Sequence, residues 1–336
     1  MKTSSKTEAV QQHSTPDSIP DHTHSLVDLS SNVVVCYVRP DGDDSNDGLS
    51  DTPDGAFNSI RRAVEAMQEY RRTGNCTIYV ADGTYNEAVY ISGGEWIGRD
   101  TLYIEGNTTS PSSCVINSRA GVGIQIHNKI NVIIKGIKVI SAGHGFQAFD
   151  YSFMMIEHCD FGPCFNAHMS LGRHSRIRII KDYTISGDAE EHVICDGLSI
   201  FSSSMATVTF EGTRTFSRAV FVCEYQSSSL QFASPLVTYT GNVKGTQYIV
   251  GANATLVTTA PDLSFLPGDA KGYTWGGGVA VSVTSRAELS APDGWTSPSG
   301  IADRTGFDTE TATTQDVAKT LKALIDDLME KGIIRE

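Results

Sequence analysis

Short runs of alternating apolar and polar residues, bounded by Gly, Asn, Asp or Ser, fill the chain from residue 76 to residue 282. This period of two predicts short β-strands separated by turns. Similar strand-like segments begin at Asn131, Ser152, Ser175, Ala206, Ser228 and Ala254. Their spacing of roughly 21 to 31 residues predicts a solenoid of stacked coils. One interior stack of apolar side chains is then expected to contain Ile133, Met155, Ile177, Val208, Leu230 and Leu256.

A large antiparallel β-sandwich is the alternative arrangement of such strands. However, two-residue turns of the Asn-Gly type, which hairpins prefer, are rare between them. Helical spacing of apolar residues appears on both sides of the strands, at residues 60–67 and 313–334. We therefore expect four parts: an extended N-terminal arm (1–32), a solenoid that begins with a helix (33–282), a linker (283–312) and a C-terminal amphipathic helix (313–336).

Charge and hydropathy exclude several classes of partner. The chain has 336 residues, 26 Lys and Arg against 39 Asp and Glu, and a formal net charge of −13. This acidic balance argues against a nucleic-acid partner, because phosphates require clustered basic residues. No apolar run reaches the about 18 residues of a membrane span, so no membrane insertion is expected. The first residues lack the apolar core of a secretory signal, so we expect synthesis in the cytoplasm without a signal peptide.

The cysteines are scattered without a Cys-x-x-Cys pair, and several lie inside strand-like runs. Buried, reduced thiols are the expectation, with zinc binding or a disulfide as the alternatives. The seven residues are Cys36, Cys76, Cys114, Cys159, Cys164, Cys195 and Cys223.

Residues 33–67 read VVVCYVRPDGDDSNDGLSDTPDGAFNSIRRAVEAM: a β-rich run, a turn and an amphipathic helix. This combination resembles the opening of the right-handed parallel β-helix in the pectate-lyase-like superfamily. The resemblance implies an all-β, right-handed parallel β-helix with an N-terminal capping helix. Such a helix covers a first coil that would otherwise expose an unpaired strand edge. Residues 262–282 resemble an ending that is common in phage structural proteins with a β-helix.

A His-x-His element lies within residues 20–30, PDHTHSLVDLS, which resemble part of phage tail-fibre shafts. In some such shafts three copies of the element meet on a threefold axis and coordinate a metal ion. The resemblance implies His22 and His24 as ligands in a homotrimer. Alternate residues of an extended strand point the same way, so three chains would offer six imidazoles to iron or another transition-metal ion. Two solvated histidines in a flexible arm are the alternative.

The loop at residues 41–54 is rich in oxygen ligands. The spacing from Asp43 through Asp47 to Asp54 imitates an EF-hand, which makes Asp43 and Asp47 candidate Ca²⁺ ligands. The helix that precedes an EF-hand loop is missing, and the twelfth residue is Asp rather than Glu. A tight turn without metal is therefore the alternative.

Candidate chemistry on the solenoid is less specific. Many β-helix relatives cleave acidic polysaccharides, which requires an Asp cluster for Ca²⁺ with a basic residue, or two catalytic carboxylates. Asp150, Glu157 and Asp160 are the candidate acids, although they form no recognisable lyase motif and equally suit solvated turns. Aromatic residues that could stack on sugars, or pack beneath the first helix, are crowded near the first coils. They are Tyr79, Tyr85, Tyr90, Trp96 and Tyr103.

Together with the resemblance, these features predict a non-catalytic bacteriophage virion protein, a homotrimeric tail fibre or tail spike component that mediates attachment to the host. The N-terminal arm and the C-terminal helix would contact other virion proteins, and the solenoid would face a host glycan or protein. Two alternatives stay open. One is a polysaccharide depolymerase, a lyase or a glycoside hydrolase, on the same fold. The other is a purely architectural virion decoration protein.

Overall fold

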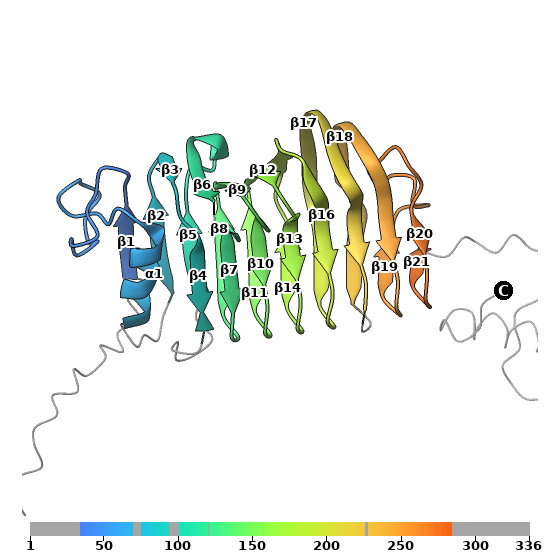
Figure 1. Ribbon diagram of the computed structural model, residues 1–336, viewed down its shortest axis with the longest axis horizontal. Coiled ribbons are helices and arrows are strands. Elements are labelled where there is room, and N and C mark those ends of the chain that lie inside the picture. The colour runs from blue at the N-terminus through green and yellow to red at the C-terminus, as the bar shows by residue number, and fades with distance from the viewer. Residues whose placement is uncertain (1–33, 70–74, 94–100, 120, 226–227, 284–336) are drawn as a thin grey trace, which may run out of the picture. The chain divides into compact units, whose positions relative to one another are not determined.

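The computed structural model describes residues 34–69, 75–93, 101–119, 121–225 and 228–283 (Figure 1). They form a parallel β-solenoid of about 8 turns. Only 6% of the described residues are helical, and the arrangement is consistent with a right-handed β-helix. The predicted solenoid is confirmed. The antiparallel sandwich is wrong, because neighbouring strands in the described part pair in parallel.

The chain divides into two compact units, Met1–Ser285 and Arg286–Glu336, and every described residue belongs to the first unit. The predicted arm (1–32) and C-terminal helix (313–336) lie outside the described residues, as does the linker (283–312) apart from Val283. Among the described helices, none is long and apolar enough to cross a membrane.

Strand pairing follows three series along the solenoid, which we call faces A, B and C. Face A contains β4 (Val89–Ser92), β7 (Ile124–His127), β10 (Phe146–Ala148), β13 (Ala167–Leu171), β16 (Ala189–Cys195) and β20 (Tyr273–Thr274). Face B contains β1 (Val34–Val38), β2 (Cys76–Val80), β5 (Thr101–Glu105), β8 (Asn131–Lys135), β11 (Phe153–Glu157), β14 (Arg176–Ile179), β19 (Thr255–Thr258) and β21 (Val279–Ser282). Face C contains β3 (Gly83–Tyr85), β6 (Cys114–Ser118), β9 (Lys138–Ser141), β12 (Asp160–Cys164) and β15 (Tyr183–Ile185).

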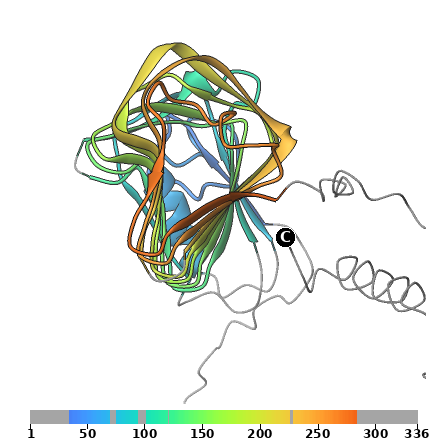
Figure 2. The ribbon, with the colours of Figure 1, turned by 90° about the vertical axis from the view of Figure 1, so that its right-hand side faces the viewer.

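Two long strands, β17 (Ile200–Cys223) and β18 (Ser229–Val250), join all three faces. Their register shifts three times, between Ser204 and Ala206, between Thr209 and Thr213, and between Thr215 and Ala219. Such irregularities bend a strand, so one continuous strand can follow a whole coil. A view along the solenoid shows the successive coils superimposed around one interior (Figure 2).

The interior of face B includes a ladder of apolar side chains with the register Val132, Met154, Ile177, Phe201, Leu230 and Leu256. The prediction was wrong for Ile133 and Met155, which point to the other side and are only half-buried. It was also wrong to place Val208 in this stack, because Val208 pairs with Tyr183 on face C. In β8 and β11 the apolar residues are consecutive, so alternation alone does not decide which of them point inward. A shift of one residue in register exchanges the inward and outward sides.

The helix α1 (Ile60–Glu69) lies against β1, β2 and β4. Its buried stripe contains the predicted residues Ile60, Ala63, Val64 and Met67, together with Ala66. Glu87 binds its first turn, since the two carboxylate oxygens accept the backbone N–H groups of Ile60 (2.8 Å) and Arg61 (3.0 Å). A carboxylate there satisfies helix donors that have no partner within the helix.

Candidate functional site

The turns that lead from face A to face B use backbone geometry that most residues avoid. Most of these turns place two consecutive residues in the left-handed region, at φ between 48° and 80°. The residues are Asn128 and Lys129, Asp150 and Tyr151, Arg173 and His174, Gly197 and Leu198, Ala252 and Asn253, and Gly276 and Gly277, together with Tyr225. A non-glycine residue in this region costs about 1–2 kcal/mol. Repeating that cost in coil after coil requires compensation.

Hydrogen bonds between successive coils compensate for part of the cost of this left-handed backbone. The backbone N–H of Lys129 donates to the carbonyl of Asp150 (2.9 Å), Tyr151 to Arg173 (3.0 Å), and His174 to Gly197 (2.8 Å). Each turn is therefore held by the turn of the next coil. Because the partners lie about 20 residues apart in sequence, the conformation is imposed by stacking rather than by local preference.

A ladder of buried serines follows the same turns. Ser152, Ser175, Ser199 and Ser228 are at most 2% exposed. Their hydroxyls accept the backbone N–H of the preceding coil: Ile130 to Ser152 (3.4 Å), Ser152 to Ser175 (3.2 Å), Ser175 to Ser199 (3.1 Å) and Ser199 to Ser228 (3.3 Å). Buried N–H groups are costly when unpaired, so this ladder fixes the corner of the solenoid.

Large side chains project from this fixed corner into solvent. We define the aromatic ridge as Tyr151, His174, Leu198, Tyr225 and Trp275. Exposed fractions are 61% for Tyr151, 45% for Leu198, 55% for Tyr225 and 42% for Trp275. The rings of Tyr151 and His174 stack at 4.6 Å and 10°, and those of Tyr225 and Trp275 meet edge to face at 6.3 Å. Adjacent coils lie about 4.8 Å apart, so the ridge runs along the solenoid.

Charged groups support the ridge at both ends. The Arg173 guanidinium lies over the Phe149 ring at 5.1 Å and pairs with Asp150 at 3.4 Å. At the other end the indole N–H of Trp275 donates to Glu224 Oε1 (3.2 Å). The indole rests on Gly251, where an added Cβ would lie 2.1 Å from the ring. Only glycine leaves room for the ring in this position.

Glu224 belongs to a buried ion network. Arg218 donates to Glu191 Oε1 (3.0 Å) and to Glu224 Oε2 (2.5 Å), and the two glutamates are 3% and 7% exposed. Burial raises the pKa of Glu191, and the bond from Arg218 opposes that shift. One guanidinium thus binds both carboxylates. The network fixes the acceptor of Trp275 instead of leaving a free acid–base pair.

The three predicted catalytic acids engage three different cations. Asp150 pairs with Arg173, Glu157 with Lys135 (3.9 Å) and Asp160 with Lys138 (3.0 Å). Asp160 is only 3% exposed. Asp150 precedes β11 whereas Glu157 ends it, and a strand rise of about 3.3 Å per residue separates the two by more than about 13 Å. Their catalytic role stays a prediction.

The loop at residues 41–54 folds on its own hydrogen bonds. Asp43 Oδ1 accepts from the backbone N–H (2.8 Å) and the hydroxyl (2.7 Å) of Ser45, which lowers the pKa of Asp43. Asp47 Oδ1 accepts from the N–H of Leu49 (2.9 Å). Both are the turns that Asp makes without metal. Ca²⁺ at Asp43 and Asp47 therefore stays a prediction.

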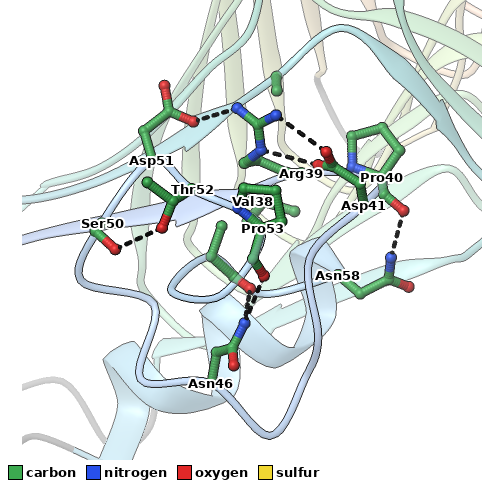
Figure 3. Close-up of polar contacts among 12 residues, drawn as sticks. Val38, Arg39, Pro40, Asp41, Asn46, Ser50, Asp51, Thr52, Pro53 and Asn58 are labelled. Atoms are coloured by element: carbon green, nitrogen blue, oxygen red, sulfur yellow. Dashed lines mark hydrogen bonds and ion pairs between the residues drawn. The ribbon is translucent and has the colours of Figure 1, made fainter.

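Further contacts close this loop (Figure 3). Arg39 bridges Asp41 (2.8 Å) and Asp51 (2.9 Å), and its hydrogen bond lowers the pKa of Asp41. The amide of Asn46 donates to the carbonyls of Pro53 (2.9 Å) and Ala56 (2.8 Å). Within the described ranges, no group of three or more His, Cys, Asp or Glu is arranged to hold a metal ion. The predicted metal ligands His22 and His24 lie outside those ranges.

Two fully buried histidines form a polar contact inside the solenoid. His168 Nδ1 and His192 Nδ1 are 3.1 Å apart, and His192 Nε2 lies 3.0 Å from the Tyr183 hydroxyl. Phe161 and Phe216 pack against both imidazoles. Burial lowers the pKa of His168 to about 3 and that of His192 well below its usual value. Both imidazoles are therefore neutral at pH 7.

The remaining predictions concern the cysteines and the aromatic residues near the first coils. All seven cysteines are buried, as expected, and they form no disulfide with one another. Burial raises the pKa of Cys114, Cys159 and Cys164 to about 12. Among the aromatic residues near the first coils, Tyr85 is buried and Tyr79 stacks on Tyr37, while Trp96 lies outside the described residues. The ridge was missed because its members are far apart in sequence, and only the Asn, Asp and Gly in some turns signal left-handed geometry.

Comparison of the chain with protein-family models, with curated proteins and with solved structures found no match.

Proposed function

We propose that this chain is a non-catalytic structural component of a bacteriophage virion, a homotrimeric tail fibre or tail spike subunit that attaches the particle to its host. The observation that carries the proposal is the aromatic ridge. Exposed aromatic side chains on strained backbone lower stability, and such strain persists where it serves binding. Tyr and Trp also provide large contact areas with little conformational entropy to lose.

The solenoid suits a part that must present such a surface rigidly. About 8 turns at about 4.8 Å each give a stack nearly 40 Å long. Backbone hydrogen bonds and the serine ladder link each coil to the next. Parallel association of three identical chains forms a closed assembly that resists shear. The arm (1–32), with His22 and His24, and the helix (313–336) would join the subunit to its copies and to other virion proteins.

The ion pairs support binding rather than hydrolysis of the host surface. Asp150, Glu157 and Asp160 each face a cation, and Glu191 and Glu224 share Arg218. A glycoside hydrolase needs one protonated acid and one free carboxylate across a sugar. These five acids are engaged in holding the coils.

Light scattering with and without a strong chelator tests the assembly. A trimer is expected, and one that loosens with chelator supports a metal at His22 and His24. A trimer that ignores the chelator keeps the fibre and removes the metal. A stable monomer contradicts the trimeric shaft.

Binding of fluorescently labelled protein to a panel of bacterial strains tests attachment. The double variant Tyr151→Ala/Tyr225→Ala should lose binding to any strain that the unchanged protein recognises. Tyr90→Ala is the matched control, because Tyr90 is 51% exposed and lies on β4, away from the ridge. Unchanged binding by the ridge variant, or binding to no strain, counts against the proposal. Release of reducing ends from host polysaccharide would instead favour a depolymerase.

A further inference from the structure

A shallow open depression of about 480 Å³ lies on the outer side of face B. Residues of β14, β17, β18 and β19 and the residue after β19 line it, among them Arg176, Arg178, Ser202, Gln231 and Thr259. Arg176 follows the ridge residue His174 by two positions, so the depression begins beside the aromatic ridge. Its volume is in the range of pockets that hold one small ligand.

Two exposed arginines give this depression a positive charge. Arg176 and Arg178 alternate along β14 and point to the same side, with Cα atoms about 6.6 Å apart. Neither forms an ion pair with another described residue. Two acids near β14 are engaged elsewhere: Glu157, at the end of the paired strand β11, binds Lys135, and Asp182, which follows β14, accepts the N–H of Thr207 (2.6 Å).

No acidic residue lines the depression, although the chain carries a net charge of −13. Two adjacent guanidinium groups repel each other weakly in water, and an anion between them removes that repulsion. Arginine is suited to this role because its planar donors bind carboxylate and phosphate groups in pairs. The local charge is therefore opposite to that of the whole chain.

Neutral polar groups lie beside the arginines on the same outer side. In strand register Ser202 is next to Arg178 and Gln231 is next to Ser202, and both line the depression. Ser203 also borders the depression, but it shares the inward side of β17 with Phe201, so its buried hydroxyl faces the interior. The exposed Gln231 would bind further hydroxyl groups of the same ligand.

We infer that Arg176 and Arg178 bind a carboxylate or phosphate group carried on a sugar, and that the rest of the sugar chain lies on the aromatic ridge. This inference rests on the proposed attachment function and names the class of ligand, an anionic glycan. The ridge supplies apolar stacking that any sugar can use. The arginines supply selection for charge.

Titration of the full-length protein with two acidic probes tests the site: a galacturonic acid hexasaccharide and a phosphorylated mannose oligosaccharide. The fully methyl-esterified hexasaccharide and the unphosphorylated mannose oligosaccharide are their uncharged counterparts. At least one acidic probe should bind more than about ten-fold tighter than its counterpart, since each charge-assisted bond contributes roughly ten-fold or more. Whichever probe shows this preference identifies the anion. Equal binding of both pairs overturns the inference, as does binding of inorganic phosphate alone with the sugar adding nothing.

Variants assign the effect to the two arginines. Arg176→Gln/Arg178→Gln should lose the preference for the acidic probe, and Arg176→Lys/Arg178→Lys should keep part of it. Lys181→Gln/Lys244→Gln removes the same charge from exposed positions outside the depression and should keep all of it. Unchanged preference in the arginine double variant contradicts the site, provided that its thermal unfolding matches that of the unchanged protein.

Cell binding separates this inference from the proposed function. If the arginine variant loses both the acidic probe and the bacteria, both proposals are supported. If the probe binds through the arginines but no strain is bound, the anion site stands and the attachment function fails. If bacteria bind through the ridge and the acidic probe has no preference, attachment stands and the anion site fails.

Discussion

Acidification should destabilise this fold through the buried pair His168 and His192. The pKa of His168 falls from 6.5 to about 3 on folding because burial disfavours the charged imidazole. Below pH 6.5 the unfolded chain therefore binds a proton that the folded chain does not. With respect to this group, the free energy of unfolding keeps its full value above pH 6.5. It decreases as the pH falls from 6.5 toward the pKa that His168 has in the folded state. Between pH 7.0 and pH 4.5 the loss from His168 alone is about 2.5 kcal/mol.

Two other sets of groups affect the total. The pKa of His192 is also lowered, so its contribution has the same sign. Burial raises the pKa of Glu87, Glu191 and Asp196. These acids favour the folded state at lower pH and oppose the histidines. The comparison must therefore be made between variants rather than on one protein.

Urea unfolding at pH 7.0 and pH 4.5, at one fixed protein concentration, measures the effect. The variant His168→Phe keeps an aromatic ring among Phe161 and Phe216 but cannot bind a proton. Its loss of stability between the two pH values should be smaller by about 2.5 kcal/mol than that of the unchanged protein. His174→Gln, at an exposed position, should behave like the unchanged protein. Equal pH dependence for all three proteins would refute the reasoning.

Three further predictions concern the corner of the solenoid. Ser175→Ala should lower the free energy of unfolding by about 1–3 kcal/mol, because the buried N–H of Ser152 loses its acceptor; urea unfolding measures it. Gly251→Ala should displace the indole of Trp275, since its Cβ would lie 2.1 Å from the ring, and should change tryptophan emission. Leu198→Gly should raise the free energy of unfolding by about 1 kcal/mol, because glycine adopts φ 62° without strain, while binding to bacteria weakens.

Each of these predictions has a matched comparison. Ser202→Ala removes a hydroxyl from the outer side of the same region and should change stability by less than about 0.5 kcal/mol. Trp275→Phe removes the emission that Gly251→Ala is expected to shift. Leu198→Ala keeps a Cβ on the strained backbone, so a gain in stability equal to that of Leu198→Gly would contradict strain as the cause.

The sequence was sufficient to predict the solenoid, but not to predict which residues of each strand point into its interior. The spacing of strand-like segments predicted stacked coils, because each coil repeats the same demand for buried apolar residues. At Ile133 and Met155, however, the neighbours are also apolar, and local alternation cannot choose between the sides. The choice depends on the register with the strands before and after, which is contact between coils and leaves no trace within one segment.

The sequence did not predict the aromatic ridge, for a related reason. Asn128 and Gly276 occupy left-handed positions that their types favour, but Tyr151 and Leu198 occupy them against preference. The N–H of Tyr151 donates to the carbonyl of Arg173 in the next coil. After both residues, the following N–H is paired by the hydroxyl of a serine more than 20 residues away. Turn signals read along the chain therefore find some of these corners and miss the ones that bear the exposed side chains.

This distribution of strain is itself an argument about function. The serine ladder and the hydrogen bonds between coils would hold glycine at Tyr151, His174 or Leu198 at least as well as the residues present, as they do at Gly197 and Gly276. Packing does not require the larger side chains, because they project into solvent. Stability therefore gives no reason for bulky apolar groups in the left-handed positions of several coils. The proposed attachment function would provide such a reason, because a ridge that follows the solenoid axis suits contact with an extended ligand.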